Sequence, residues 1–135
     1  MKSYTKVNHK TKIKKMQLSF SFDLTNNFDI DDKVFLVHNI VEGMNLSFLN
    51  NAYSNRGRKP VVNPKTMLKV LVFAYLNRKY SSRDIEEVCK YDLRFRWLLN
   101  NKKSPDHVSI NRFRNKIYPF MDEILNQLIN LLIDY

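Results

Sequence analysis

Residues 63–76 constrain the fold most, because they predict a helix that is apolar on nearly every face. Asn63 can cap this helix, and Pro64 suits its first turn, where a missing backbone N–H costs nothing. The apolar residues that follow are Met67, Leu68, Val70, Leu71, Val72, Phe73, Tyr75 and Leu76. A helix that is apolar on all sides belongs at the centre of a core, so we expect this segment there.

Further helices are predicted on both sides of this segment, and the fold class is expected to be mainly α. Only two glycines occur in 135 residues, which disfavours hairpins and glycine-rich phosphate loops. Asp31 or Asp32 can cap a helix that ends near Gly43, and residues 44–62 are expected to be irregular. Four later helices are expected, beginning at Ser81, at Asp92, at Asp106 or Ser109 (through about Lys116), and at Pro119.

The first 30 residues are expected to form a separate segment. Residues 1–16 are predicted to be a flexible basic arm. In residues 17–22, Leu18, Phe20 and Phe22 alternate with polar residues, as in a short half-buried strand. No second strand is predicted, so the partner of this strand is expected elsewhere. We therefore divide the chain into the arm and strand (1–30) and a helix-turn-helix-like helical bundle (31–135).

The charge of the chain favours a polyanionic partner. It has 23 Lys and Arg against 13 Asp and Glu, a formal net charge of +10. Six Lys and no acid lie in residues 1–22, and sixteen Lys and Arg against five acids lie in residues 56–116. Each phosphate that such a surface neutralises releases counterions, which favours binding to nucleic acid. A basic surface that is merely solvated is the alternative.

Residues 107–116 are the main candidate for a helix that reads DNA. Ile110, Phe113 and Ile117 share one face, which leaves polar residues on the other. Arg can pair with guanine, Asn with adenine, and Lys or Ser with phosphate. Two short helices precede this one, as in a helix-turn-helix, although the connection at 100–106 is longer than usual. The predicted base-reading residues are Ser109, Asn111, Arg112 and Asn115, and a surface helix that is merely basic is the alternative.

Phosphate contacts are expected from basic residues on and around this helix. Arg94 and Arg96 alternate with Phe95 and Trp97, so the aromatic rings should pack inward and the arginines should face solvent or phosphate. A base-stacking platform is the less favoured interpretation. The turn at 56–60 is either an arm for a minor groove or a plain exposed loop. The predicted phosphate contacts are Arg56, Arg58, Lys59, Arg94, Arg96, Lys102, Lys103, Arg114 and Lys116.

Neither a catalytic site nor a metal site is predicted. The three histidines lie far apart, there is one Cys, and the adjacent acids at 31–32 and 86–87 are explained as caps or solvated faces. Cys89 is expected to be a core residue in a reducing cytoplasm. The N-terminus does not resemble a signal peptide, and the apolar run at 70–76 is too short for a bilayer. A cytoplasmic, nucleoid-associated protein without a membrane contact is therefore expected.

A series of motifs runs in order through the chain. They are Gly57-Arg58-Lys59-Pro60, Asn63-Pro64-Lys65-Thr66-Met67-Leu68-Lys69-Val70, Tyr75-Leu76-Asn77-Arg78, Ser81-Ser82-Arg83-Asp84-Ile85-Glu86, Arg96-Trp97-Leu98-Leu99, Ser104-Pro105-Asp106-His107 and Ile110-Asn111-Arg112-Phe113-Arg114. In this order they resemble the N-terminal domain of bacterial insertion-sequence DDE transposases. The segment Gln17-Leu18-Ser19-Phe20 is similar to the start of such proteins.

The resemblance implies both a function and a missing part. Members of the family bind the terminal inverted repeats of their own mobile element through N-terminal helices. They cut and join DNA with a later RNase H-like domain, in which two Asp and one Glu surround divalent metal ions. The resemblance thus implies that this chain recognises inverted repeats in double-stranded DNA for transposition, without catalytic residues or a cofactor of its own. Divalent metal is expected only in the catalytic domain that the chain lacks.

Two alternatives remain open. The chain could be a stand-alone repressor or inhibitor of transposition that binds DNA, or a helical dimerisation module that does not. The second alternative rests on residues 120–133, an apolar helix whose uncovered face is either the seam of a homodimer or a sign that the natural protein continues. The unpaired strand at 17–22 and this helix are both interpreted as signs of a part beyond Tyr135.

Overall fold

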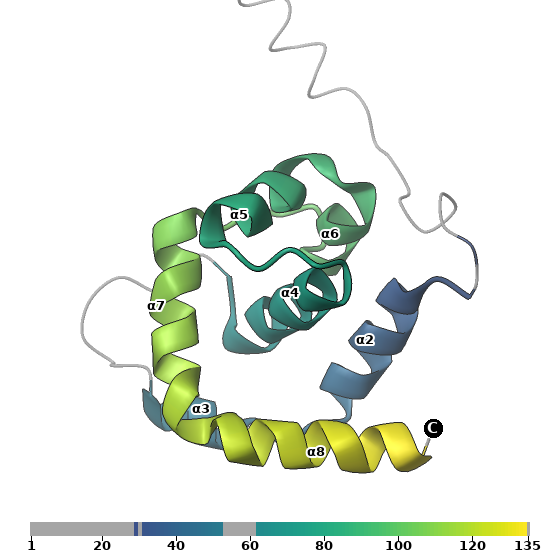
Figure 1. The fold of residues 1–135 in the computed structure, drawn as a ribbon, viewed down its shortest axis with the longest axis vertical. Helices are drawn as coiled ribbons and strands as arrows, with labels where there is room; N and C mark the ends of the chain where they lie inside the picture. The colour runs from purple at the N-terminus through teal and green to yellow at the C-terminus, as the bar shows by residue number, and fades with distance from the viewer. Residues whose placement is uncertain (1–28, 30, 53–61, 135) are drawn as a thin grey trace, which may run out of the picture.

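The computed structural model of the chain describes residue 29, residues 31–52 and residues 62–134, and the regular elements in these ranges are helical (Figure 1). The elements are α2 (Lys33–Glu42), α3 (Ser47–Ala52), α4 (Pro64–Leu76), α5 (Ser82–Tyr91), α6 (Leu93–Leu98), α7 (His107–Ile117), the short 3-10 helix η2 (Tyr118–Phe120) and α8 (Met121–Asp134). The predicted mainly α class is therefore confirmed. The predicted arm at 1–16, the strand at 17–22 and the basic turn at 56–60 lie outside the described residues.

α4 lies in the middle of the molecule, as its apolar sequence predicts (Figure 1). Helices α2, α5, α6 and α7 all contact it. The side chain of Asn63 accepts a hydrogen bond from the Thr66 N–H at 2.9 Å, and Pro64 occupies the first turn, both as predicted. The buried residues of α4 are Met67, Leu68, Lys69, Val70, Leu71, Phe73 and Ala74.

Carboxylate and hydroxyl caps begin four other helices close to their predicted starts. Each cap accepts a hydrogen bond from a backbone N–H that has no partner within the helix. Asp32 accepts from Val34 (2.9 Å), Ser81 from Asp84 (3.1 Å), Asp92 from Arg94 (2.9 Å) and Asp106 from Ser109 (2.7 Å). For the two helices with two candidate caps each, the cap in the structure is Asp32 for α2 and Asp106 for α7. Gly43 ends α2, as predicted.

The prediction that residues 44–62 are irregular is wrong for α3. The side chain of Asn45 accepts a hydrogen bond from the Ser47 N–H at 3.2 Å, at the start of this helix. Leu49 is fully buried, and the ring centroids of Phe48 and Phe120 lie 5.1 Å apart. Contacts with a distant part of the chain therefore stabilise a helix that local propensity does not reveal.

The prediction that Pro119 opens the last helix is also wrong. Residues 118–120 form η2, and α8 begins at Met121. Proline lacks a backbone N–H, and its ring clashes with the carbonyl four residues earlier, so it ends α7 instead of continuing a helix. The chain changes direction here, and α8 runs away from α7 along the edge of the molecule (Figure 1).

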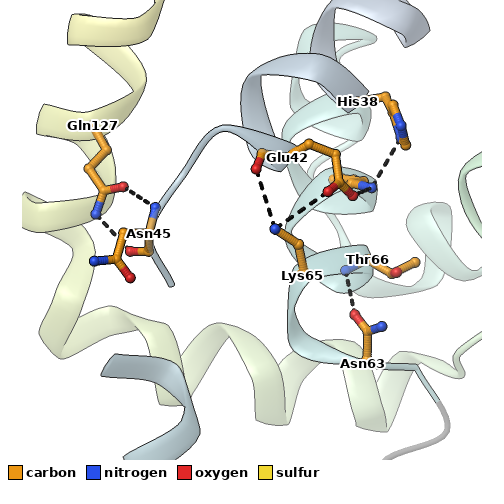
Figure 2. Close-up of polar contacts among 8 residues, drawn as sticks. His38, Glu42, Asn45, Asn63, Lys65, Thr66 and Gln127 are labelled. Carbon is orange, nitrogen blue, oxygen red and sulfur yellow. Dashed lines mark hydrogen bonds and ion pairs between the residues drawn. The ribbon is translucent and has the colours of Figure 1, made fainter. Parts of the chain in front are cut away.

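A buried lysine links α4 to α2. The ammonium of Lys69 donates to the carboxylate of Glu42 and lies 3.0 Å from Nδ1 of His38. Because an ammonium can only donate, Nδ1 of His38 must accept, and the ring is neutral with its proton on Nε2. Lys65 also pairs with Glu42 at 3.5 Å (Figure 2). The hydrogen bond from Lys69 lowers the pKa of Glu42, and burial, helped by the charge of Lys69, lowers the pKa of His38.

α8 is anchored on one side and leaves an apolar stripe on the other. The side chain of Gln127 accepts from the Asn45 N–H (2.7 Å) and donates to the Asn45 carbonyl (2.9 Å), as Figure 2 shows. The stripe consists of residues between 46% and 76% exposed, namely Leu125, Ile129, Leu132 and Ile133. The uncovered face predicted for residues 120–133 is thus present. Among the helices of the described ranges, none is long and apolar enough to cross a membrane.

Acidification is expected to lower the free energy of unfolding through His38. Its folded-state pKa lies below the ordinary value of 6.5, so the unfolded chain binds more protons and the stabilisation is lost as the pH falls through this range. His38→Gln keeps an acceptor for Lys69 and removes the titrating ring. Urea unfolding between about pH 7.5 and 5.5 should show a flatter pH dependence in this variant. Equal losses of stability in both proteins would show that His38 is not the source.

Candidate nucleic-acid interface

α7 has one buried face and one exposed polar face. Ile110, Phe113 and Ile117 are buried, as their spacing predicts. Because 3.6 residues make one turn, the opposite face presents Val108, Asn111, Arg112, Asn115 and Lys116, all of which are exposed. Three of the four predicted base-reading residues therefore lie together on the solvent face of one helix.

Ser109, the fourth predicted base-reading residue, lies at the edge of this face and takes part in the helix cap. Its backbone N–H donates to Asp106 at 2.7 Å, and its hydroxyl donates to the same carboxylate. These two hydrogen bonds lower the pKa of Asp106. The hydroxyl of Ser109 therefore already has a partner within the chain.

Arg114 links α7 to the turn between α4 and α5. Its Nη1 donates to the carbonyl of Tyr80 at 2.6 Å, and its Nη2 donates to Oδ1 of Asn111 at 3.0 Å. A guanidinium has donors only, so the atom of Asn111 that faces it must be the oxygen. The amide nitrogen of Asn111, with its two N–H groups, is left for other partners.

Arg94 and Arg96 both have partners within the chain. Arg94 pairs with Asp92 at 3.2 Å, and its guanidinium carbon lies 5.1 Å from the centroid of the Phe73 ring. Arg96 donates to the Cys89 carbonyl (3.4 Å) and to Oδ1 of Asn101 (3.1 Å). The hydrogen bond to Asp92 raises the pKa of Arg94. Both arginines therefore stabilise the arrangement of helices.

The aromatic residues between these arginines pack inward, as predicted. Phe95 is buried, and the centroid of its ring lies 5.0 Å from that of the Phe73 ring. Trp97 is partly buried, with edge contacts of 5.0 Å to the rings of Phe35 and His38. These packed rings are not free to stack on bases, so the structure does not favour the stacking platform.

Lys102 and Lys103 lie in the loop that leads into α7. Asn100 and Asn101 reverse the chain after α6 with left-handed φ angles of 54° and 55°, which asparagine tolerates better than most residues. The two lysines that follow are exposed, and no ion pair involves them among the described residues. Two predicted phosphate contacts are thus presented just before the first residue of α7.

A second group of cations, which the sequence did not predict as a site, lies beside α7. Arg78, Lys79 and Arg83 lie in the α4–α5 turn and the first turn of α5, and all three are exposed. In the described part of the chain, none of them forms an ion pair. The basic pair Arg78-Lys79 is visible in the sequence, but only the Arg114–Tyr80 hydrogen bond reveals that it adjoins α7.

Catalytic chemistry is not evident in the described ranges. They contain no group of three or more His, Cys, Asp or Glu residues that could hold a metal ion. Burial raises the pKa of the Cys89 thiol to about 12, so this thiol stays protonated at neutral pH. Cys89 is fully buried and is a core residue, as predicted.

Residues 22–116 match a family model described as a transposase domain (DUF772). This segment is more than half of the chain and runs from before α2 into the last turn of α7. The chain therefore belongs to this family of transposase domains, which supports a role in transposition. No curated protein and no solved structure matches the chain.

Replacing the cap of α7 should destabilise the protein. Asp106→Ala removes the acceptor of the Ser109 N–H, and such losses cost about 0.5–2 kcal/mol. Asp106→Asn keeps an acceptor and should retain most of the stability in urea denaturation at neutral pH. Because the pKa of Asp106 is lowered from 3.8 on folding, its carboxylate stabilises above that value and loses this effect as the pH falls through the folded pKa. Equal losses for the two variants would contradict the capping role.

Proposed function

We propose that this chain binds double-stranded DNA and recognises the terminal inverted repeats of an insertion sequence, with α7 entering the major groove. The observation that supports this most is the exposed polar face of α7, in a chain that belongs to a transposase-domain family. A helix fits the major groove, where each base pair presents a distinct pattern of donors and acceptors. In this proposal α5, α6 and α7 act as a helix-turn-helix-like unit with α7 as its recognition helix.

The contacts within the chain suggest which base atoms each side chain can bind. Arg112 is exposed and makes no hydrogen bond within the described residues, so its guanidinium is available for the O6 and N7 acceptors of guanine. The amide of Asn115 is likewise exposed and has both a donor and an acceptor, which a bidentate contact with adenine requires. Asn111 shares its oxygen with Arg114 and turns its donors outward, which suits guanine N7 or thymine O4 better.

Phosphate contacts are proposed around this helix. Lys102 and Lys103 are exposed at its N-terminal end, and Lys116 is exposed near its C-terminal end. The partners of Arg94, Arg96 and Arg114 within the chain favour structural roles for these three. Arg56, Arg58 and Lys59 remain proposed contacts outside the described residues.

The role proposed for these residues is recognition, not strand cleavage. In a DDE-type transposase, cleavage would belong to a separate RNase H-like domain, where carboxylates and divalent metal ions supply the chemistry. The partner proposed for this chain is the DNA of the element itself, so we place its action at the bacterial nucleoid in the cytoplasm. A repressor that occupies the same element ends would use the same face of α7.

Arg112→Ala should reduce sequence preference more than overall affinity. The probe is a duplex that the chain itself selects from a random-sequence pool, compared with an unselected duplex of the same length. Loss of a base-reading arginine should cost about 1–3 kcal/mol on the selected duplex and much less on the random one. Dissociation constants measured by fluorescence anisotropy would show this difference, and equal losses on both duplexes would contradict the role of Arg112 in reading a base.

The matched control for this variant is Lys102→Ala/Lys103→Ala. These lysines are proposed to contact phosphate, so their loss should weaken both duplexes alike. The slope of log K against log salt should become shallower by about 0.9 for each phosphate that is no longer neutralised. If the unaltered chain binds neither duplex even at low salt, the DNA-binding proposal is wrong.

Pairing of two copies through α8 is a second candidate function, which the exposed stripe favours. Ile129→Glu places a charge in the middle of the stripe and should shift a dimer toward monomer in sedimentation equilibrium. Asn130→Glu adds the same charge at an exposed polar position of α8 that faces away from Leu125 and Leu132, and should leave the dimer intact. A chain that is monomeric at all concentrations would exclude pairing through α8.

A further inference from the structure

Three exposed cations on one side of α7 have no role in the function proposed above. They are Arg78 and Lys79 in the α4–α5 turn and Arg83 in α5, and we call them the α4–α5 corner. The backbone of this turn is closely bonded, since the N–H groups of Arg78 and Lys79 donate to the carbonyls of Tyr75 (3.1 Å) and Ala74 (2.8 Å). This pattern ends α4 in a Schellman motif, with Arg78 in the left-handed region at a φ of 60°. The corner is therefore a defined surface of the fold.

Arg114 fixes this corner against the proposed base-reading helix. Its guanidinium donates both to the Tyr80 carbonyl in the turn (2.6 Å) and to Asn111 on the exposed face of α7 (3.0 Å). A second link joins the same two helices, because Nδ1 of His107 lies 3.3 Å from the carboxylate of Glu86. α5 packs directly on α7. The corner and the face of α7 therefore form parts of one surface.

Exposed cations lie in the loop before α7 and in the turn that is bonded to the C-terminal half of α7. Lys102 and Lys103 precede the first residue of α7, whereas the corner is bonded to Arg114, seven residues after His107. Seven residues of an α-helix span about 10 Å. The major groove is about 12 Å wide and is bordered by a phosphate strand on each side. If the axis of α7 crosses the groove, this separation brings one group of cations toward each strand.

The acids of α5 do not cancel the charge of the corner. Glu86, which faces α7, is paired with Lys90 (3.8 Å) and with His107 (3.3 Å). Asp84 and Glu87 border a hollow of the surface together with Lys79. Of the three cations of the corner, Lys79 is therefore the one whose positive charge these acids reduce most. Arg83 is in no ion pair within the ranges described, and we take it as the main member of the corner.

We propose that the α4–α5 corner is a second phosphate-binding surface, which contacts one backbone strand of the duplex whose bases α7 reads. This inference rests on the DNA binding proposed for α7. It adds a second strand contact opposite that of Lys102 and Lys103, with Arg114 holding the two parts of the surface together. The ligand is a pair of adjacent backbone phosphates, so the contact is independent of base sequence.

Arg83→Ala tests this proposal, and Lys33→Ala is its matched control. Each variant removes one exposed charge, and Lys33 belongs to α2, on the opposite side of α4 from α7 (Figure 1). Arg83→Ala should weaken the selected and random duplexes alike and reduce the salt slope by about 0.9, the value for one phosphate contact. Lys33→Ala should change neither. Circular dichroism and urea midpoints would verify that both variants are folded.

The outcomes separate this inference from the function on which it rests. If Arg83→Ala behaves like Lys33→Ala while Arg112→Ala still loses sequence preference, the corner proposal is wrong and the function of α7 stands. If the unaltered chain binds no duplex at low salt, both are wrong.

Neutral methylphosphonate linkages, placed one at a time in the selected duplex, give a second and independent measurement. A substitution at a corner phosphate should weaken binding of the unaltered chain and have no further effect on Arg83→Ala. Substitutions that lose their effect in Lys102→Ala/Lys103→Ala should fall on the other border of the groove. If the same phosphates respond to both variants, the corner does not contact a second strand.

Discussion

Burial of most residues from 67 to 74 in α4 determines how the rest of the chain is arranged. Each large apolar side chain that is fully buried contributes about 1.5–3 kcal/mol, so this helix strongly favours a fold in which others surround it. The one charged residue buried in it, Lys69, adds a condition, because an unpaired ammonium in a core costs several kcal/mol. Glu42 and His38 meet that condition, so α2 must pack with this face toward α4. Lys69 thus fixes which face of α2 packs on α4, whereas apolar packing alone would allow other orientations of α2.

The same core determines which residues α7 presents to solvent. Ile110, Phe113 and Ile117 are buried, and their burial fixes the rotation of the helix about its axis. The polar residues between them therefore face outward without any further interaction. Arg114 then refines this surface, since it orients the amide of Asn111 and holds the α4–α5 turn beside the helix. The exposed face of α7 thus owes its orientation to core packing. The orientation of the Asn111 amide on this face depends on the guanidinium of Arg114.

Local signals predicted much of this fold, and long-range contacts account for what they missed. Caps such as Asn63 and Asp92 act within three residues, so their roles can be read from the sequence. α3 was missed because its stability depends on the contact between Phe48 and Phe120, which are far apart in the chain. The α4–α5 corner was missed for the same reason, since Arg114 and the Tyr80 carbonyl are 34 positions apart. The ordered motifs predicted a transposase domain, and the family match confirms it at that level.

The many cations in residues 56–116 fall into two groups, which only the structure distinguishes. Some cations are bonded within the chain and hold helices together, namely Lys65, Lys69, Arg94, Arg96 and Arg114. Others are exposed without an ion pair in the described ranges, namely Arg78, Lys79, Arg83, Lys102, Lys103 and Arg112. The second group lies on α7 or at its flanks, so the positive charge left for a ligand is concentrated around one helix. Net charge alone favours any polyanion, whereas this concentration beside outward-facing amides favours a partner that presents phosphates and base edges together.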